Sequence, residues 1–110
     1  MKARIVTLCG STRFGRAFEE AELSLTLLGC VVLTIGCNLK SDAELFAHLP
    51  TEKVEQIKRG LDVLHLEKID LSDEIFVLNV QGYIGESTRA EIEYAERTGK
   101  IVRYLYPYEV

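Results

Sequence analysis

Short runs of consecutive hydrophobic residues alternate along the chain with longer segments in which hydrophobic residues recur every three or four positions. The consecutive runs predict strands over residues 4–9, 30–35, 74–79 and 101–106. The helical periodicity predicts helices over about residues 13–28, 51–71 and 89–98. Between them, Ser41 to Glu44 has the form of a capping box, and it predicts a short helix that Pro50 ends or follows.

Alternating strands and helices predict an α/β domain with a parallel sheet, and the nearly continuous apolar strands indicate that helices cover both faces. Right-handed crossovers favour the strand order 2-1-3-4 in a Rossmann- or flavodoxin-like sheet of four to five strands. Such sheets bind ligands outside the carboxyl ends of the strands where the chain reverses direction. Two loops, residues 10–15 and 82–87, are expected there. We therefore predict a single domain, 1–110, with its binding site at this edge.

Composition narrows the classes of partner. The 110 residues are 47% hydrophobic and 27% charged, as in an ordinary globular domain. The net charge of −4 argues against nucleic acid or an anionic membrane surface as the main partner. The longest apolar run, 27–35, is about half of the ~20 residues that cross a bilayer. With no targeting segment visible, we expect a cytoplasmic protein.

The three cysteines are Cys9, Cys30 and Cys37, an odd number without CxxC spacing. Two of them lie in apolar runs and are interpreted as buried thiols in a reducing compartment. We expect no zinc site, no other metal and no redox cofactor, because the sequence contains neither a ligand cluster nor a dinucleotide motif.

The first loop is a candidate phosphate site. Gly10, Ser11 and Thr12 offer backbone N–H groups and two hydroxyls before a helix, whose start favours anions. Arg13 adds a guanidinium suited to phosphate. The loop matches neither a Walker A motif nor GxGxxG, which gives no support to an ATPase or a Rossmann dehydrogenase. The alternative is a capped helix with solvated arginines, and the loop alone does not separate the two.

The second loop leads to Glu91. Thr88 and Glu91 have the spacing of a capping box, in which Glu91 would only bond back to the backbone of Thr88, and spacing alone favours this interpretation. In the functional interpretation, Glu91 projects over the crevice as a carboxylate nucleophile or base. Ser87 and Thr88 would then offer hydroxyl and N–H groups to an anion.

Three further polar residues are weaker candidates for contacts with a ligand. His65 lies on the second long helix, where a packed or surface histidine is the commoner case. Asn79 ends the third strand and is expected to point toward the crevice, and Tyr83 could stack on a base or simply fill its loop. Tyr104, Tyr106 and Tyr108 occupy every second position and are interpreted as one face of an edge strand that a second subunit could cover.

Three segments resemble the nucleoside 2-deoxyribosyltransferase-like proteins, a group that includes the 2′-deoxynucleoside 5′-phosphate N-glycosidases. These segments are Leu8 to Arg16, Ser72 to Asn79, and Glu91 to Ala95 followed by Gly99-Lys100. The first is similar to the glycosidases' phosphate-binding loop, the second to the family's central strand, and the third to its Glu-Leu-Gly-Tyr-Ala segment. Together they touch most of the chain in the family's order.

The resemblance implies roles for individual residues. Glu91 falls on the family's nucleophilic glutamate, which attacks the anomeric carbon of a deoxyribosyl group. Gly10, Ser11, Arg13 and Ser87 fall on positions that hold a 5′-phosphate. The family's aspartate before the third strand is replaced here by His65, with Asp62 and Asp70 nearby.

We therefore expect an N-glycosidase or deoxyribosyltransferase acting on a nucleoside or its 5′-monophosphate. The replaced aspartate motivates an alternative, an inactive nucleotide-binding or sensing module of the same fold. A structural subunit that binds no nucleotide is a third possibility. The family also implies a homodimer or larger homo-oligomer.

Overall fold

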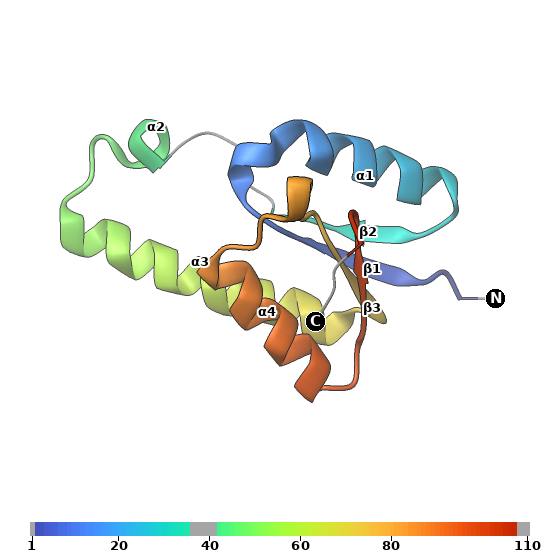
Figure 1. Cartoon of the computed structure of the whole chain (residues 1–110). Helices are drawn as coiled ribbons and strands as arrows, with labels where there is room; N and C mark the ends of the chain where they lie inside the picture. Colours follow the sequence, from blue (N-terminus) through green and yellow to red (C-terminus); the bar gives the residue numbers. More distant parts are fainter. Residues whose placement is uncertain (1, 36–41, 108–110) are drawn as a thin grey trace.

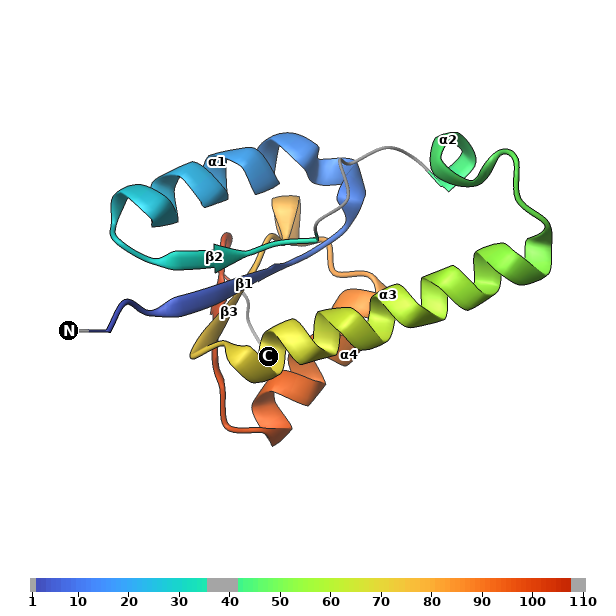
Figure 2. The same cartoon turned by 180° about the vertical axis from the view of Figure 1, so that it is seen from behind.

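The computed structural model describes residues 2–35 and 42–107, and it forms a parallel sheet between two layers of helix (Figures 1 and 2). The strands are β1 (Ile5–Cys9), β2 (Val31–Leu33), β3 (Glu74–Val77) and β4 (Ile101–Tyr104). The helices are α1 (Gly15–Leu27), α2 (Asp42–Phe46), α3 (Thr51–Leu71) and α4 (Glu86–Arg97), with 3-10 turns η1 (Thr12–Phe14) and η2 (Val80–Gly82).

The strand order is β2-β1-β3-β4 and every pairing is parallel, which confirms the predicted topology. Helix α1 covers one face of the sheet, whereas α3 and α4 cover the other (Figure 1). Successive residues of β1 point to opposite faces, so Leu8 packs with Phe18 of α1 while Cys9 packs with Ile69 of α3. Each helical layer thus closes its own half of the core.

The positions of the three long helices follow from local sequence. Helix α3 spans the predicted residues, and α1 is preceded by the turn η1. Gly29 and Gly99 adopt positive φ angles of 88° and 77° and close α1 and α4 as C-cap glycines.

Among the described residues, no helix is both long enough and apolar enough to cross a membrane.

Helix α4 departs from the prediction in a way that affects the site. It begins at Glu86, three residues earlier than expected, and Gly85 occupies its N-cap. Thr88 is therefore inside the first turn and buried, so the proposed capping box between Thr88 and Glu91 is wrong. The polar sequence Glu-Ser-Thr, which is typical of a loop, is compatible with a first helical turn because its N–H groups need no intrahelical acceptor.

Strands β2, β3 and β4 are shorter than predicted: they span Val31–Leu33, Glu74–Val77 and Ile101–Tyr104, whereas the predicted ranges are 30–35, 74–79 and 101–106. Strand β4 ends at Tyr104, which is half-buried, and Tyr106 follows it outside the strand and is exposed. Tyr108 lies outside the described residues, as does Ser41 of the predicted capping box, although the short helix α2 is present.

Candidate functional site

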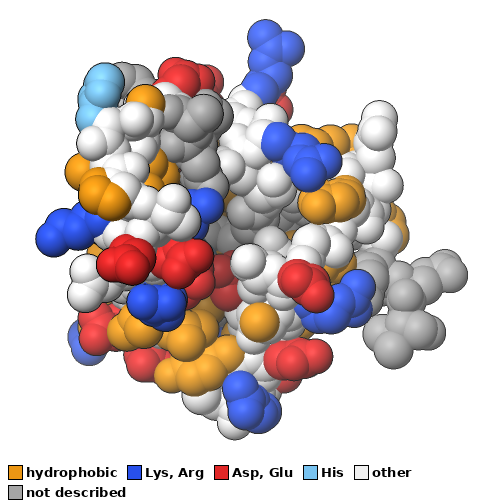
Figure 3. Space-filling view, turned by 90° about the vertical axis from the view of Figure 1, so that its left-hand side faces the viewer, with side chains coloured by type: hydrophobic (Ala, Val, Ile, Leu, Met, Phe, Trp, Pro, Cys, Tyr) orange, Lys and Arg blue, Asp and Glu red, His pale blue; other side chains and the backbone are white. Residues whose placement is uncertain are grey.

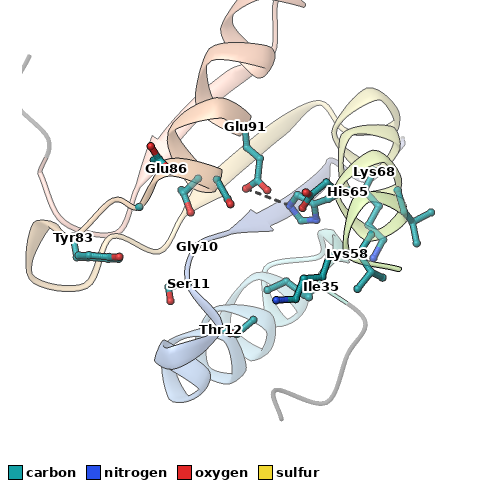
Figure 4. Close-up of a pocket in the computed structure, with 16 residues that line it drawn as sticks. Gly10, Ser11, Thr12, Ile35, Lys58, His65, Lys68, Tyr83, Glu86 and Glu91 are labelled. Carbon is teal, nitrogen blue, oxygen red and sulfur yellow. Dashed lines mark ion pairs between the residues drawn. The ribbon is translucent and has the colours of Figure 1, made fainter. Parts of the chain in front are cut away.

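A cavity of about 490 Å³ opens at the carboxyl ends of β1 and β3, where the strand order predicts a ligand site. Its walls come from the loop after β1, the first turn and a half of α4, and one face of α3 (Figure 4). The volume is in the range of small-molecule sites. Acidic and basic side chains are interspersed over the described part of this end of the molecule (Figure 3).

The loop after β1 forms one side of the cavity. Gly10 is required there, because its φ is +156° and an added Cβ would lie 3.2 Å from the Cβ of Leu78. This close approach brings Ser11 and Thr12 to the cavity wall. Ser11 also caps η1, with its hydroxyl accepting a bond of 3.4 Å from the backbone N–H of Arg13. Both interpretations of the loop, capping and exposure to a ligand, therefore apply to Ser11.

Arg13 does not line the cavity. Its guanidinium carbon lies 4.5 Å from the centre of the Tyr83 ring, and Nη2 donates a bond of 3.4 Å to the Tyr83 hydroxyl. Phe14 meets the same tyrosine edge to face, with 5.9 Å between ring centres. Arg13 thus connects the loop after β1 to the loop that carries Tyr83, and Tyr83 itself lines the cavity.

The first turn of α4 supplies polar groups to the opposite wall. Gly85, Glu86, Ser87 and Thr88 all line the cavity. The earliest backbone hydrogen bond of this turn joins the N–H of Arg89 to the carbonyl of Gly85 at 2.9 Å. The N–H groups that precede it have no acceptor within the helix, and together with the helix dipole they favour an anion.

Glu91 projects from the second turn of α4 toward α3 (Figure 4). Its Oε1 lies 3.7 Å from Nε2 of His65, and this nitrogen lies 3.4 Å from Sγ of Cys9 at the end of β1. Only 10% of the His65 side chain and 17% of the Glu91 side chain are exposed, and Cys9 is buried. Three titratable groups from three elements of the fold therefore converge at the inner end of the cavity.

Burial is the main cause of the pKa shifts of the three groups in this cluster. Loss of hydration raises the pKa of Glu91 from 4.5 to about 7, with Asp62 adding to the increase and a hydrogen bond from Cys9 opposing it. Burial, followed by the positive charge of Lys68, lowers the pKa of His65 to about 4. Burial and the Glu91 carboxylate raise the pKa of the Cys9 thiol well above its usual value. At neutral pH the imidazole is therefore neutral, and Glu91 is present in both its protonated and its ionised form.

Helix α3 contributes a set of residues that sequence reasoning mostly missed. Lys58, Asp62, His65 and Lys68 recur at spacings of four and three, and all line the cavity with Leu61 and Leu64. The sequence does contain a signal for this set, because the spacing of the four residues places their polar groups on one helical face beside the apolar stripe. Lys68 Nζ donates a hydrogen bond of 2.6 Å to the carbonyl of Thr34, and this bond connects α3 to the residue after β2.

Asn79 and Asp70 lie outside the cavity lining. The Asn79 side chain is fully buried, and its amide both donates to the carbonyl of Tyr106 at 3.0 Å and accepts from the N–H of Tyr106 at 2.9 Å. The expectation that Asn79 points toward the crevice is therefore wrong, because the chain beyond β4 occupies its polar atoms. Asp70 instead accepts a bond of 2.6 Å from the hydroxyl of Tyr94.

Comparison with known proteins does not identify this site, so its interpretation depends on its geometry. The chain matches no protein-family model, and no curated protein gives a significant match. The class of protein defined here is accordingly an α/β domain whose cavity, at the carboxyl edge of a parallel sheet, is lined by hydroxyl groups and by both acidic and basic side chains.

Proposed function

We propose that this protein cleaves the N-glycosidic bond of a nucleoside 5′-monophosphate, with Glu91 as the nucleophile. The observation that carries the proposal is the position of Glu91, a largely buried carboxyl group that reaches into a cavity with hydroxyl and N–H groups along one wall. The resemblance of three segments to nucleoside 2-deoxyribosyltransferase-like proteins supports the same assignment.

A nucleotide fits the distribution of chemistry along the cavity. The 5′-phosphate would lie between Ser11 and the start of α4, where N–H groups and hydroxyls of Ser87 and Thr88 favour an anion. The sugar would then face Glu91, and the base would extend toward Leu61 and Leu64 on α3. The hydroxyl-rich end favours a nucleotide over a free nucleoside.

The reaction would proceed in two displacements. The ionised Glu91 carboxylate attacks the anomeric carbon, the C–N bond breaks, and its electron pair leaves with the base, which takes up a proton. The resulting glycosyl ester is cleaved by water in a hydrolase or by a second base in a transferase, and Glu91 is regenerated. His65 Nε2 lies 3.7 Å from the Glu91 carboxylate, and because the imidazole is neutral it does not pair the charge of the nucleophile.

The test is base release from a panel of ribo- and deoxyribonucleoside 5′-monophosphates, followed by chromatography, for wild type and Glu91→Gln. We expect release by the wild type and at least a hundredfold loss in the variant. Glu93→Gln is a matched control, because Glu93 is on the same helix but exposed. Mass spectrometry of the acid-quenched reaction should show the sugar phosphate attached to wild-type protein only.

Two outcomes contradict the proposal. Base release that survives Glu91→Gln would remove Glu91 from the nucleophile's role. Saturable nucleotide binding without base release from any nucleotide, or from nucleosides supplied with an acceptor base, would instead favour the binding or sensing module.

A further inference from the structure

The inner end of the cavity combines the three donor types that zinc takes in proteins, a thiol, an imidazole and a carboxyl group. The donor atoms of Cys9, His65 and Glu91 all lie within 4.8 Å of one another. They come from the end of β1, the middle of α3 and the second turn of α4, so the sheet and two packed helices hold their relative positions. This arrangement differs from a surface group of acids, because every member is buried or nearly so.

The separations agree with tetrahedral coordination. With zinc bonds of about 2.3 Å to sulfur and about 2.1 Å to nitrogen, tetrahedral angles place sulfur and nitrogen ligands about 3.6 Å apart, and nitrogen and oxygen about 3.4 Å apart. The corresponding distances here are 3.4 Å from Cys9 Sγ to His65 Nε2 and 3.7 Å from His65 Nε2 to Glu91 Oε1. Two of the three separations are therefore within a few tenths of an ångström of the tetrahedral values, and the third, between Cys9 and Glu91, is at most 4.8 Å.

Charge and access also fit a divalent cation. A thiolate at Cys9 and a carboxylate at Glu91 together balance the two charges of zinc, and Asp62 on the cavity wall adds negative potential. The ammonium of Lys68, which donates a hydrogen bond to the carbonyl of Thr34, opposes this potential with its positive charge. His65 and Glu91 both line the cavity, which gives the ion a path from solvent.

We propose that Cys9 Sγ, His65 Nε2 and a Glu91 carboxylate oxygen bind a Zn²⁺ ion, with the fourth coordination position open to the cavity. Binding forms three metal–ligand bonds and displaces waters from the hydrated ion. The thiol proton of Cys9, and the Glu91 proton where one is present, pass to solvent. The sequence predicted no zinc site because the ligands are far apart in the chain and have no CxxC-type spacing.

The experiment uses the intact chain, freed of metal with a chelator, and needs no nucleotide. Titration with Co²⁺ should saturate at one equivalent and produce a thiolate charge-transfer band with the intense visible bands of a tetrahedral site. Zn²⁺ should displace the cobalt and should compete for the protein against a chromogenic chelator. Cys9→Ser should abolish the charge-transfer band, and His65→Gln and Glu91→Gln should each weaken zinc binding at least tenfold.

Two matched controls use the same residue types elsewhere. Cys30→Ser changes a half-buried cysteine near Arg4, and His48→Gln changes an exposed histidine; both should bind cobalt and zinc as the wild type does. Thermal unfolding of each variant checks that it is folded. The wild-type cobalt spectrum tests sulfur ligation even where a variant fails to fold.

Three results would overturn the proposal: no saturable binding by the wild type, a cobalt spectrum without the thiolate band, or equal losses in the controls. Because the assay measures metal and not base release, its outcome is independent of the glycosidase proposal. The consequence for activity does rest on that proposal: a bound ion draws charge from the Glu91 carboxylate and makes it a weaker nucleophile, so zinc should inhibit base release.

Discussion

Replacing Glu91 with glutamine should stabilise the protein, and by an amount that depends on pH. Burial raises the pKa of Glu91 from 4.5 to about 7, so folding at high pH must keep an ionised carboxyl group in a poorly hydrated position. A raised carboxyl pKa gives a stabilising contribution that is present below 4.5 and is lost as pH rises through about 7. Glutamine resembles the protonated carboxyl group at every pH.

The size of the effect follows from the two pKa values. At 1.36 kcal/mol per pKa unit, the difference between 4.5 and about 7 corresponds to about 3 kcal/mol above pH ~8. This is a large share of the ~5–15 kcal/mol that holds a typical domain folded. Because the Glu91 side chain is only 17% exposed, solvent screening reduces this figure little. The pKa of His65 is lowered to about 4, but His65 is present in both proteins and its contribution cancels to first order.

The assay is urea unfolding of wild type, Glu91→Gln and Glu93→Gln at pH ~5 and pH ~8.5, in the presence of a chelator. The stability gained by Glu91→Gln should grow by about 2–3 kcal/mol between these pH values. Glu93→Gln should change stability by less than about 0.5 kcal/mol at both, because Glu93 is exposed. A gain for Glu91→Gln that is equal at the two pH values, or a loss of stability at pH ~8.5, would refute the argument.

Three further predictions concern other parts of the site. In metal-free protein, base release should increase with pH through about 7, because the nucleophile is the ionised form of Glu91; a flat profile between pH ~5 and ~8 would contradict this. Arg13→Ala and Tyr83→Ala should both raise KM, and the double variant should raise it by less than the product of the two single effects, because both single changes remove the same Arg13–Tyr83 contact. Gly10→Ala should cost about 1–3 kcal/mol in unfolding experiments, whereas Gly60→Ala, in an open helical position, should add about 0.5–1 kcal/mol.

The fold was accessible from sequence because its determinants are local. The apolar runs fixed the strands, Gly29 and Gly99 marked helix ends, and handedness then left the order 2-1-3-4. The loops at residues 10–15 and 82–87 were correctly expected at one edge of the sheet. The start of α4 was missed because Glu86 to Thr88 is equally typical of a loop and of a first helical turn.

The inner part of the site was less accessible because its contacts are tertiary. Sequence patterns place His65 among the weaker candidate residues and predict Cys9 only as a buried thiol, but the two side chains lie 3.4 Å apart. Their proximity depends on how α3 crosses the end of β1, and periodicity gives the face of a helix but not its angle or translation on the sheet. The same holds for Asn79, which was expected to end the third strand and point toward the crevice, whereas β3 ends at Val77 and the Asn79 amide bonds to the backbone of Tyr106.

If both proposals hold, zinc and nucleotide must compete for this protein. Both the ion and the sugar would approach the Glu91 carboxylate from the cavity, and a carboxylate that coordinates zinc is a weaker nucleophile. By linkage, a saturating nucleotide should weaken zinc binding by the same factor by which zinc weakens the nucleotide. Chelator competition with and without a nonhydrolysable nucleotide analogue measures the first factor, and titration calorimetry of the analogue with and without zinc measures the second. If the analogue instead increases zinc affinity, an atom of the analogue would occupy the fourth coordination position of the ion. That result would rule out direct attack by Glu91 in the metal-bound protein.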